Sequence, residues 1–123
     1  MRTWRLDLDS DPHAALLVRH GLDDWLTLLD CTDTARQDIV VVASELVTAA
    51  FTSRARTISV RVLFDDGRLR MDVHGEGCED GDGLPGDHGN GRSLSDRIIE
   101  RASDNWGRRR DPDGLRLWAD ILC

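Results

Sequence analysis

Residues 58–73 constrain the fold of this chain more than any other stretch. Two runs in which apolar side chains alternate with mostly polar ones flank Asp66-Gly67, a pair typical of a tight two-residue hairpin turn. The alternation places the apolar positions on one face, namely Ile58, Val60, Val62, Phe64, Leu69, Met71 and Val73. A hairpin with one apolar and one polar face predicts an antiparallel sheet that is covered on one side only.

Two amphipathic helices are predicted to supply that cover. The first is expected around residues 11–30, with Ser10 as its N-cap. Its predicted apolar stripe consists of Ala15, Val18, Leu22, Trp25 and Leu29. The second is expected around residues 33–53, capped by Thr32 or Asp33. Its predicted stripe consists of Ile39, Val42, Ala43, Leu46, Val47 and Ala50.

Shorter periodic segments complete the predicted domain. Residues 4–8 alternate as a half-buried strand, and residues 105–121 form a second hairpin with its turn at 111–114. Between these segments, Ser93–Asp96 resembles a capping box that opens a short helix. The predicted apolar positions of this helix are Leu94, Ile98 and Ala102. Because there is no internal repeat and no linker, residues 1–123 are predicted to form a single α+β domain. It is a two-layer sandwich with helices on one face of a mainly antiparallel sheet.

Residues 75–91 break every period. This stretch contains seven glycines, one proline and five acidic residues, and a loop this long in a compact domain is usually functional or disordered. It is therefore predicted to be a mobile lid. His74, Cys78 and His88 lack the spacing of a zinc site, and the acidic residues lack the spacing of a calcium loop. No metal site is predicted from them.

Composition excludes several classes of function. The 123-residue chain has a formal net charge of −7, whereas a nucleic-acid-binding protein usually presents a basic face to phosphates. All 16 basic residues are arginine, so neither a P-loop lysine nor a Schiff-base lysine exists. No run approaches the roughly 20 apolar residues of a membrane span, and the N-terminus lacks the apolar core of a signal peptide. Three scattered cysteines form no CxxC motif and no disulfide framework. The expectation is a cytoplasmic protein that binds neither nucleic acid nor membrane.

The stretch SELVTAA, residues 44–50, carries a single carboxylate, Glu45. The order of four segments in this chain resembles the histidine-kinase-like ATPase fold. These segments are SELVTAA, the hairpin turn at 66–69, a Leu-Pro pair in the loop and the run Trp118–Asp120. The resemblance is strongest to the anti-sigma-factor serine-kinase branch of that superfamily, and it extends over residues 4–122. It implies an ATP site with Mg²⁺, a homodimer, and partner switching, in which a sigma factor is held until an antagonist protein displaces it.

Two positions depart from the motifs that the resemblance implies. The first motif has a carboxylate that orients or activates the attacking group, here Glu45, and one turn later an asparagine that offers Mg²⁺ an oxygen. Here that later position is Ala49, whose methyl group cannot bind a hard cation. The second motif resembles Asp-x-Gly-x-Gly, in which the Asp accepts a hydrogen bond from the adenine amino group. The matching residues are Gly75 and Gly77, so the carboxylate is missing. Glu76 does not replace it, because neighbouring residues of an extended strand point to opposite sides.

Two further parts of the predicted nucleotide pocket depart less clearly. The third motif resembles Gly-x-Gly-Leu at a helix N-terminus, where backbone N–H groups cradle phosphate. Here it reads Gly91, Arg92, Ser93 and Leu94, so a side chain stands where close backbone approach is needed. In the last strand, the family usually has a threonine near the adenine, and the register of the resemblance places Arg116 there.

Three interpretations follow, in order of preference. The first is a non-catalytic regulator of transcription that binds a protein partner, a sigma factor or its antagonist, without ATP and with Glu45 as a vestigial base. The second is an active ATP-dependent serine kinase, supported by Glu45 and the glycines that remain. The third is a small-molecule-binding protein in which Ala49, Gly75 and Phe51 line an emptied pocket. One alternative explanation of the departures stays open. The match between this sequence and the family's motifs could be shifted along the chain, with other polar groups nearby in the roles of the missing ligands.

Overall fold

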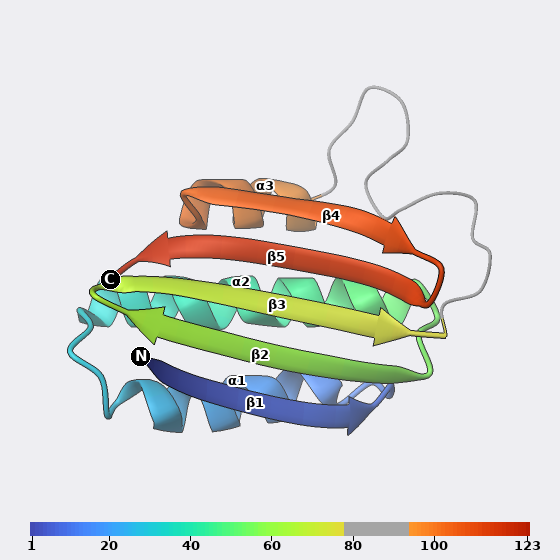
Figure 1. Cartoon of the computed structure of the whole chain (residues 1–123), viewed down its shortest axis with the longest axis horizontal. Helices are drawn as coiled ribbons and strands as arrows, with labels where there is room; N and C mark the ends of the chain where they lie inside the picture. Colours follow the sequence, from blue (N-terminus) through green and yellow to red (C-terminus); the bar gives the residue numbers. More distant parts are fainter. Residues whose placement is uncertain (78–93) are drawn as a thin grey trace.

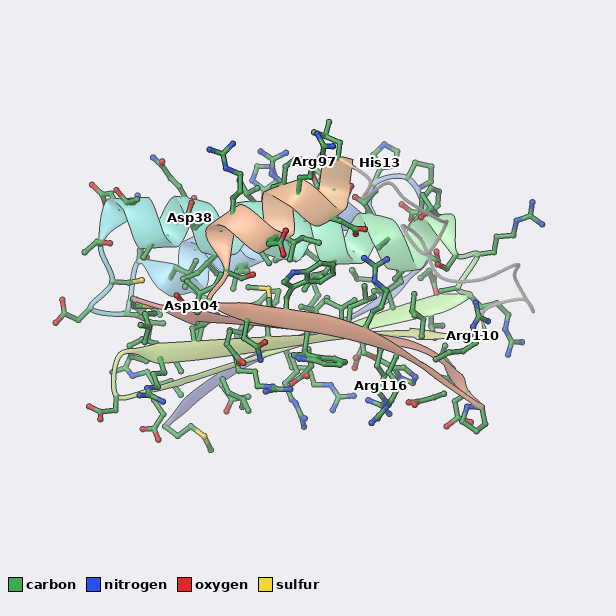
Figure 2. All side chains as sticks on the ribbon, turned by 90° about the horizontal axis from the view of Figure 1, so that it is seen from above. His13, Asp38, Arg97, Asp104, Arg110 and Arg116 are labelled. Atoms are coloured by element: carbon green, nitrogen blue, oxygen red, sulfur yellow. The ribbon has the colours of Figure 1, made fainter. Side chains whose placement is uncertain are left out.

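The computed structural model describes residues 1–77 and 94–123, which form one sheet and a layer of helices (Figure 1). The strands follow the order β1-β2-β3-β5-β4, and every neighbouring pair is antiparallel. The described helices all lie on the same face of the sheet (Figure 2). The elements are β1 Arg2–Asp9, α1 Ala14–Leu26, α2 Asp33–Thr52, β2 Thr57–Asp65, β3 Arg68–Glu76, α3 Leu94–Ala102, β4 Asn105–Asp111 and β5 Gly114–Leu122. The predicted two-layer α+β fold is confirmed.

The β2–β3 hairpin is built as the sequence predicts. Asp66 (φ 51°) and Gly67 (φ 76°) both adopt a left-handed backbone conformation, as a two-residue type I′ turn requires. The resulting register pairs Val62 with Met71. The apolar side chains on the helix-facing side are buried, namely Ile58, Val60, Val62, Leu69, Met71 and Val73. The helix-facing side of β2 and β3 thus forms part of the hydrophobic core.

α2 is the central helix of the other layer. Its N-terminus is capped by Thr32, whose hydroxyl oxygen accepts a hydrogen bond from the Ala35 N–H at 3.1 Å. Every residue of the predicted apolar stripe is fully buried, namely Ile39, Val42, Ala43, Leu46, Val47 and Ala50. The helix ends at Thr52, and the left-handed conformation of Arg54 (φ 63°) then turns the chain toward β2. The position and phase of this helix are therefore confirmed.

The start predicted for the first helix is wrong, and its predicted apolar stripe is confirmed in part, since Val18 and Leu22 are fully buried. Ser10 does not cap α1, since the helix begins at Ala14 and its N-cap residue makes no side-chain cap. Instead, the Ser10 N–H donates to the Arg56 carbonyl at 3.0 Å, and the Asp11 carboxylate accepts from the His13 N–H at 2.6 Å. The Asp11–His13 bond is local, whereas the Ser10 bond ties this segment to the residue that precedes β2. The buried stripe is Ala14, Val18, Leu22 and Leu26, whereas Ala15, Trp25 and Leu29 are half-buried.

Two further predictions need correction. In α3 the buried residues are Asp96 and Ile99. Of the predicted apolar positions, Ala102 is half-buried against the core, Ile98 is half-buried, and the Leu94 side chain is 74% exposed. Asp96 faces inward because it forms an ion pair with Arg108 of β4. The predicted lid begins too early, since β3 continues through Gly75 and Glu76, which pair with both β2 and β5. The remainder of the predicted lid, from residue 78 onward, lies outside the described residues.

The outer face of the sheet is not covered by the described helices (Figure 2). Across β3, β5 and β4 it carries alternating charges and one large aromatic ring, Trp118. The Trp118 indole lies across Gly107 of β4, where any Cβ atom would overlap the ring. Arg70 stacks on the same indole, with its guanidinium carbon 6.0 Å from the ring centroid. None of the helices in the described part of the chain is long and apolar enough to cross a membrane.

Candidate functional site

The candidate site is formed where α2 meets α3 and the end of β3. Glu45 lies on α2 and is half-buried. Its Oε2 atom accepts a hydrogen bond from the Ser95 hydroxyl of α3 at 2.7 Å. This contact joins residues 50 positions apart, and no local pattern in the sequence indicated it. The carboxylate that the sequence singled out is therefore engaged with a hydroxyl group on the neighbouring helix.

A second contact fixes α3 to the sheet. The Asp96 carboxylate pairs with the Arg108 guanidinium, and the two side chains are only 7% and 13% exposed. Arg108 also lies over the ring of Trp106, with 5.0 Å between the guanidinium carbon and the ring centroid. A buried ion pair of this kind requires both partners, because either charge alone would be desolvated without compensation. α3 is thus held to α2 through Ser95 and to β4 through Asp96.

Ala49 stands one helical turn after Glu45 and is 9% exposed. Its side chain belongs to the hydrophobic core. Its carbonyl oxygen accepts hydrogen bonds from the Thr52 hydroxyl at 3.0 Å and from the Ser53 N–H at 3.1 Å. The Ala49 methyl group therefore supplies neither a hydrogen bond nor a metal ligand to the site.

Gly75 lies on the helix-facing side of β3 and is buried, paired with Ile58 on one side and Leu115 on the other. Since α2 packs directly on β3, Ala49 and Gly75 belong to the facing surfaces of the two layers. Glu76 is exposed, as expected for the next residue of a strand. No carboxylate at positions 75 or 76 is thus directed between the layers.

Gly77 has a left-handed backbone (φ 74°), and its N–H donates to the Asp113 carbonyl at 2.9 Å. The Arg56 guanidinium packs against the Gly77 α-carbon, so any Cβ atom at this position would collide with it. The Arg56 N–H also donates to the Glu76 carbonyl at 2.9 Å. Sequence reasoning missed Arg56, because its contact with Gly77 depends on two chain segments meeting at the end of the sheet.

Arg116 does not lie with the other site residues. It is paired with His74 on the outer face of the sheet, away from the helices (Figure 2). Its guanidinium binds the Asp111 carboxylate and lowers the pKa of that group below its ordinary value. Arg116 lines a cavity of about 460 Å³ on this outer face. The register assumed for the last strand is thus one residue out, since Leu115 and Leu117 are the buried neighbours.

The third predicted motif cannot be placed. Gly91, Arg92 and Ser93 lie outside the described residues, and α3 begins at Leu94. Among the residues that are described, no group of three or more histidine, cysteine, aspartate or glutamate side chains could hold a metal ion. Within the described residues, the site therefore consists of Glu45 hydrogen-bonded to Ser95, of Ala49 and Gly75, and of Gly77 covered by Arg56.

Comparison with known proteins bears on the fold. No family model and no curated protein matches this sequence. The chain is similar to the crystal structure of the RsbU and RsbW domains of Rv1364c from Mycobacterium tuberculosis, with 21% sequence identity and a TM-score of 0.77. The similarity covers 99% of this chain and 32% of that one, so this chain spans only part of the length of the solved chain. A likeness at this level of identity shows that the two share a fold.

Proposed function

We propose that this protein is a non-catalytic regulator of the anti-sigma-factor-kinase type, which binds a protein partner without using ATP. The observation that carries the proposal is the chemistry of Ala49 and Gly75. Both are buried on the facing surfaces of α2 and β3, and neither has a polar side chain. These are the two positions at which the resemblance implies a metal ligand and an adenine acceptor.

Each loss weakens nucleotide binding for a separate physical reason. Mg²⁺ prefers oxygen ligands in near-octahedral array, and a methyl group at Ala49 provides none. An adenine amino group buried beside Gly75 without an acceptor would cost about 1–3 kcal/mol. The two positions lie in different elements, so one local change does not account for both. ATP and Mg²⁺ therefore do not fit the described residues.

The state of Glu45 supports the same proposal. A general base must be within hydrogen-bond reach of the proton that it abstracts. The Glu45 carboxylate instead accepts a hydrogen bond from the Ser95 hydroxyl, with 2.7 Å between the two oxygens, and links α2 to α3. We assign this contact a structural function, in which a former catalytic position serves to hold the helix layer together.

The fold supports the choice of partner. The similar solved chain is described as containing an RsbW domain, a name given to anti-sigma-factor kinases. We therefore propose a sigma factor or its antagonist as the partner, a homodimer as the assembled form, and the cytoplasm as the location. Binding of this kind needs a complementary surface and no nucleotide chemistry.

Calorimetric titration with Mg-ATP tests the absence of nucleotide binding. The wild-type protein should give no heat of binding at micromolar ATP and no rise in its unfolding temperature. A ligand at 100 times its dissociation constant would stabilise the fold by about 2.7 kcal/mol, so real binding would be visible. The variant Ala49→Asn with Gly75→Asp is the matched gain-of-function control and should recover part of the affinity. Micromolar binding by the wild type would instead support the active serine kinase.

A second experiment tests the protein partner. A pull-down from the native cell, followed by reconstitution with the purified candidate, should give a complex with a sigma factor or an antagonist. Its dissociation constant should be the same with ATP, with ADP and without nucleotide. The Glu45→Gln variant should bind equally well, because the amide keeps an oxygen that accepts the Ser95 hydrogen bond. Recovery of a bound metabolite and no protein would support the small-molecule interpretation.

A further inference from the structure

Two arginines stand directly opposite each other on the uncovered face of the sheet. Arg109 of β4 and Arg116 of β5 are register partners, and Figure 2 shows Arg116 on the side away from the helices. Like charges directly opposite each other in neighbouring strands are destabilising, because their Cβ atoms lie only about 5 Å apart. One half-buried carboxylate, Asp111, binds both guanidiniums and offsets this repulsion. Departures from a local rule of this kind are expected at functional sites.

The way in which Asp111 holds the two arginines leaves most of their donors unused. Its carboxylate accepts hydrogen bonds from the Nε atom of Arg109, at 3.1 Å, and from the Nε atom of Arg116. The terminal Nη groups of both guanidiniums have no partner within residues 1–77 and 94–123. Both side chains are exposed, so a ligand can reach these N–H groups. Two guanidiniums oriented side by side match the oxygens of a carboxylate or a phosphate.

The arginine pair lines a cavity of about 460 Å³ together with the indole ring of Trp118, and this volume is in the usual range for small-ligand sites. Trp118 lies two residues after Arg116 on the same face of β5, about 6.8 Å along the strand. A benzene ring with one anionic substituent spans such a distance. The indole lies across β4 because Gly107, its register partner, has no side chain there. The cavity therefore joins a flat aromatic surface to a pair of anion-binding groups.

The charge of this cavity has the opposite sign to that of the chain. Its lining contains three guanidiniums and two carboxylates, which leaves a net charge of +1, whereas the chain carries −7. A local positive charge favours an anionic ligand over a cationic one. We propose that the cavity binds a small aromatic anion, a planar ring that carries a carboxylate or a phosphate. The ring would stack on Trp118, and the anionic group would accept hydrogen bonds from Arg109 and Arg116.

This site is separate from the candidate site on the helix side. The cavity opens on the outer face of β3, β5 and β4, whereas Ala49 and Gly75 lie on the facing surfaces of the helix layer and the sheet. The binding of an aromatic anion is therefore independent of the proposed protein partner, and each proposal can fail without the other.

NMR titration of the full chain with four small probes tests the proposal. Phenyl phosphate and benzoate carry both the ring and the negative charge, inorganic phosphate carries only the charge, and benzylamine carries the ring with a positive charge. We expect phenyl phosphate or benzoate to shift the indole N–H signal of Trp118 most, and the tighter of the two identifies the anionic group. Inorganic phosphate should bind about tenfold more weakly than phenyl phosphate, since it cannot stack. Benzylamine should not bind.

Two arginine variants form a matched pair for this experiment. Arg109→Gln and Arg5→Gln each remove an arginine of an edge strand that pairs with an aspartate two positions later, and the two side chains are 67% and 62% exposed. Arg109 lines the cavity and Arg5 does not. Arg109→Gln should weaken the binding of the tighter aromatic anion about tenfold, because charge-assisted hydrogen bonds are lost. Arg5→Gln should leave the affinity unchanged.

Trp118→Phe identifies the Trp118 indole signal by its loss and should keep part of the affinity, because phenylalanine also offers an aromatic face. The proposal is overturned if the two arginine variants lose affinity equally, or if inorganic phosphate or benzylamine binds as tightly as the aromatic anions. Absence of any shift with phenyl phosphate and benzoate at millimolar concentration would overturn it as well.

Discussion

At the scale of single residues, Cys123 makes the alkaline stability of this protein open to a simple test. Burial raises the pKa of its thiol from 9.0 to about 12, and the chain contains neither lysine nor tyrosine. Cysteines are therefore the side chains that titrate in this range. The unfolded chain ionises Cys123 near pH 9.0 while the folded protein keeps it protonated. Stability is thus fully present below pH 9.0 and is lost as the pH rises toward about 12.

Urea unfolding under reducing conditions measures this effect. Between pH 9 and 11 the midpoint of the wild type should fall more steeply than that of Cys123→Ser, which lacks the buried thiol. The Cys78→Ser variant should follow the wild type. Equal slopes for all three proteins would mean that Cys123 is not the group that destabilises the fold at alkaline pH.

At the scale of secondary-structure elements, α3 depends on its buried ion pair. Asp96→Ala would leave the Arg108 guanidinium buried without its carboxylate, and we expect a loss of about 3 kcal/mol in the free energy of unfolding. Replacing both residues together, Asp96→Leu with Arg108→Met, should cost less, because no unpaired charge remains. Urea denaturation of the three proteins gives this comparison. If the double variant is as unstable as the single one, the unpaired charge of Arg108 is not the cause of the lost stability.

The elements also show what the sequence could predict. The two hairpins and α2 were predictable because turn residues and apolar periods are local, as with Asp66-Gly67 and the Thr32 cap. The phase of α3 was not, since Asp96 faces inward only because Arg108 meets it from another strand. In the candidate site, the burial of Ala49 was not predicted, since the apolar stripe derived from the helical period includes Ala50 and not Ala49. The Ser95 contact of Glu45 was not predicted either, because it joins two helices.

Arg116 shows that a resemblance to a family can misplace a single side chain. In the structure, Arg116 alternates with the buried Leu115 and Leu117 of β5, so its side chain lies on the polar face of that strand. The residue-by-residue resemblance placed it in the nucleotide pocket, one position out of register. For this strand, the alternation of apolar and polar residues predicted the direction of the side chain better than the resemblance to the family's motif.

At the scale of the whole molecule, the dominant property is the formal net charge of −7. Under the proposed function, this charge favours a partner that presents a basic patch, because long-range attraction speeds the encounter of opposite charges. Salt screens such attraction, with a Debye length of about 10 Å at 0.1 M and about 3 Å at 1 M ionic strength. Contacts buried in the finished complex are screened much less. Salt should therefore act mainly on the association rate.

Stopped-flow measurement with the purified partner tests this expectation. The association rate constant should fall about tenfold between 0.05 M and 0.5 M salt, while the dissociation rate constant changes little. Replacing the exposed Asp9 and Asp24 by asparagine removes two negative charges, takes the net charge from −7 to −5, and should flatten the dependence. An association rate that salt does not change would mean that surface charge does not select the partner. Recognition would then have to come from the shape and apolar contacts of the docking surface.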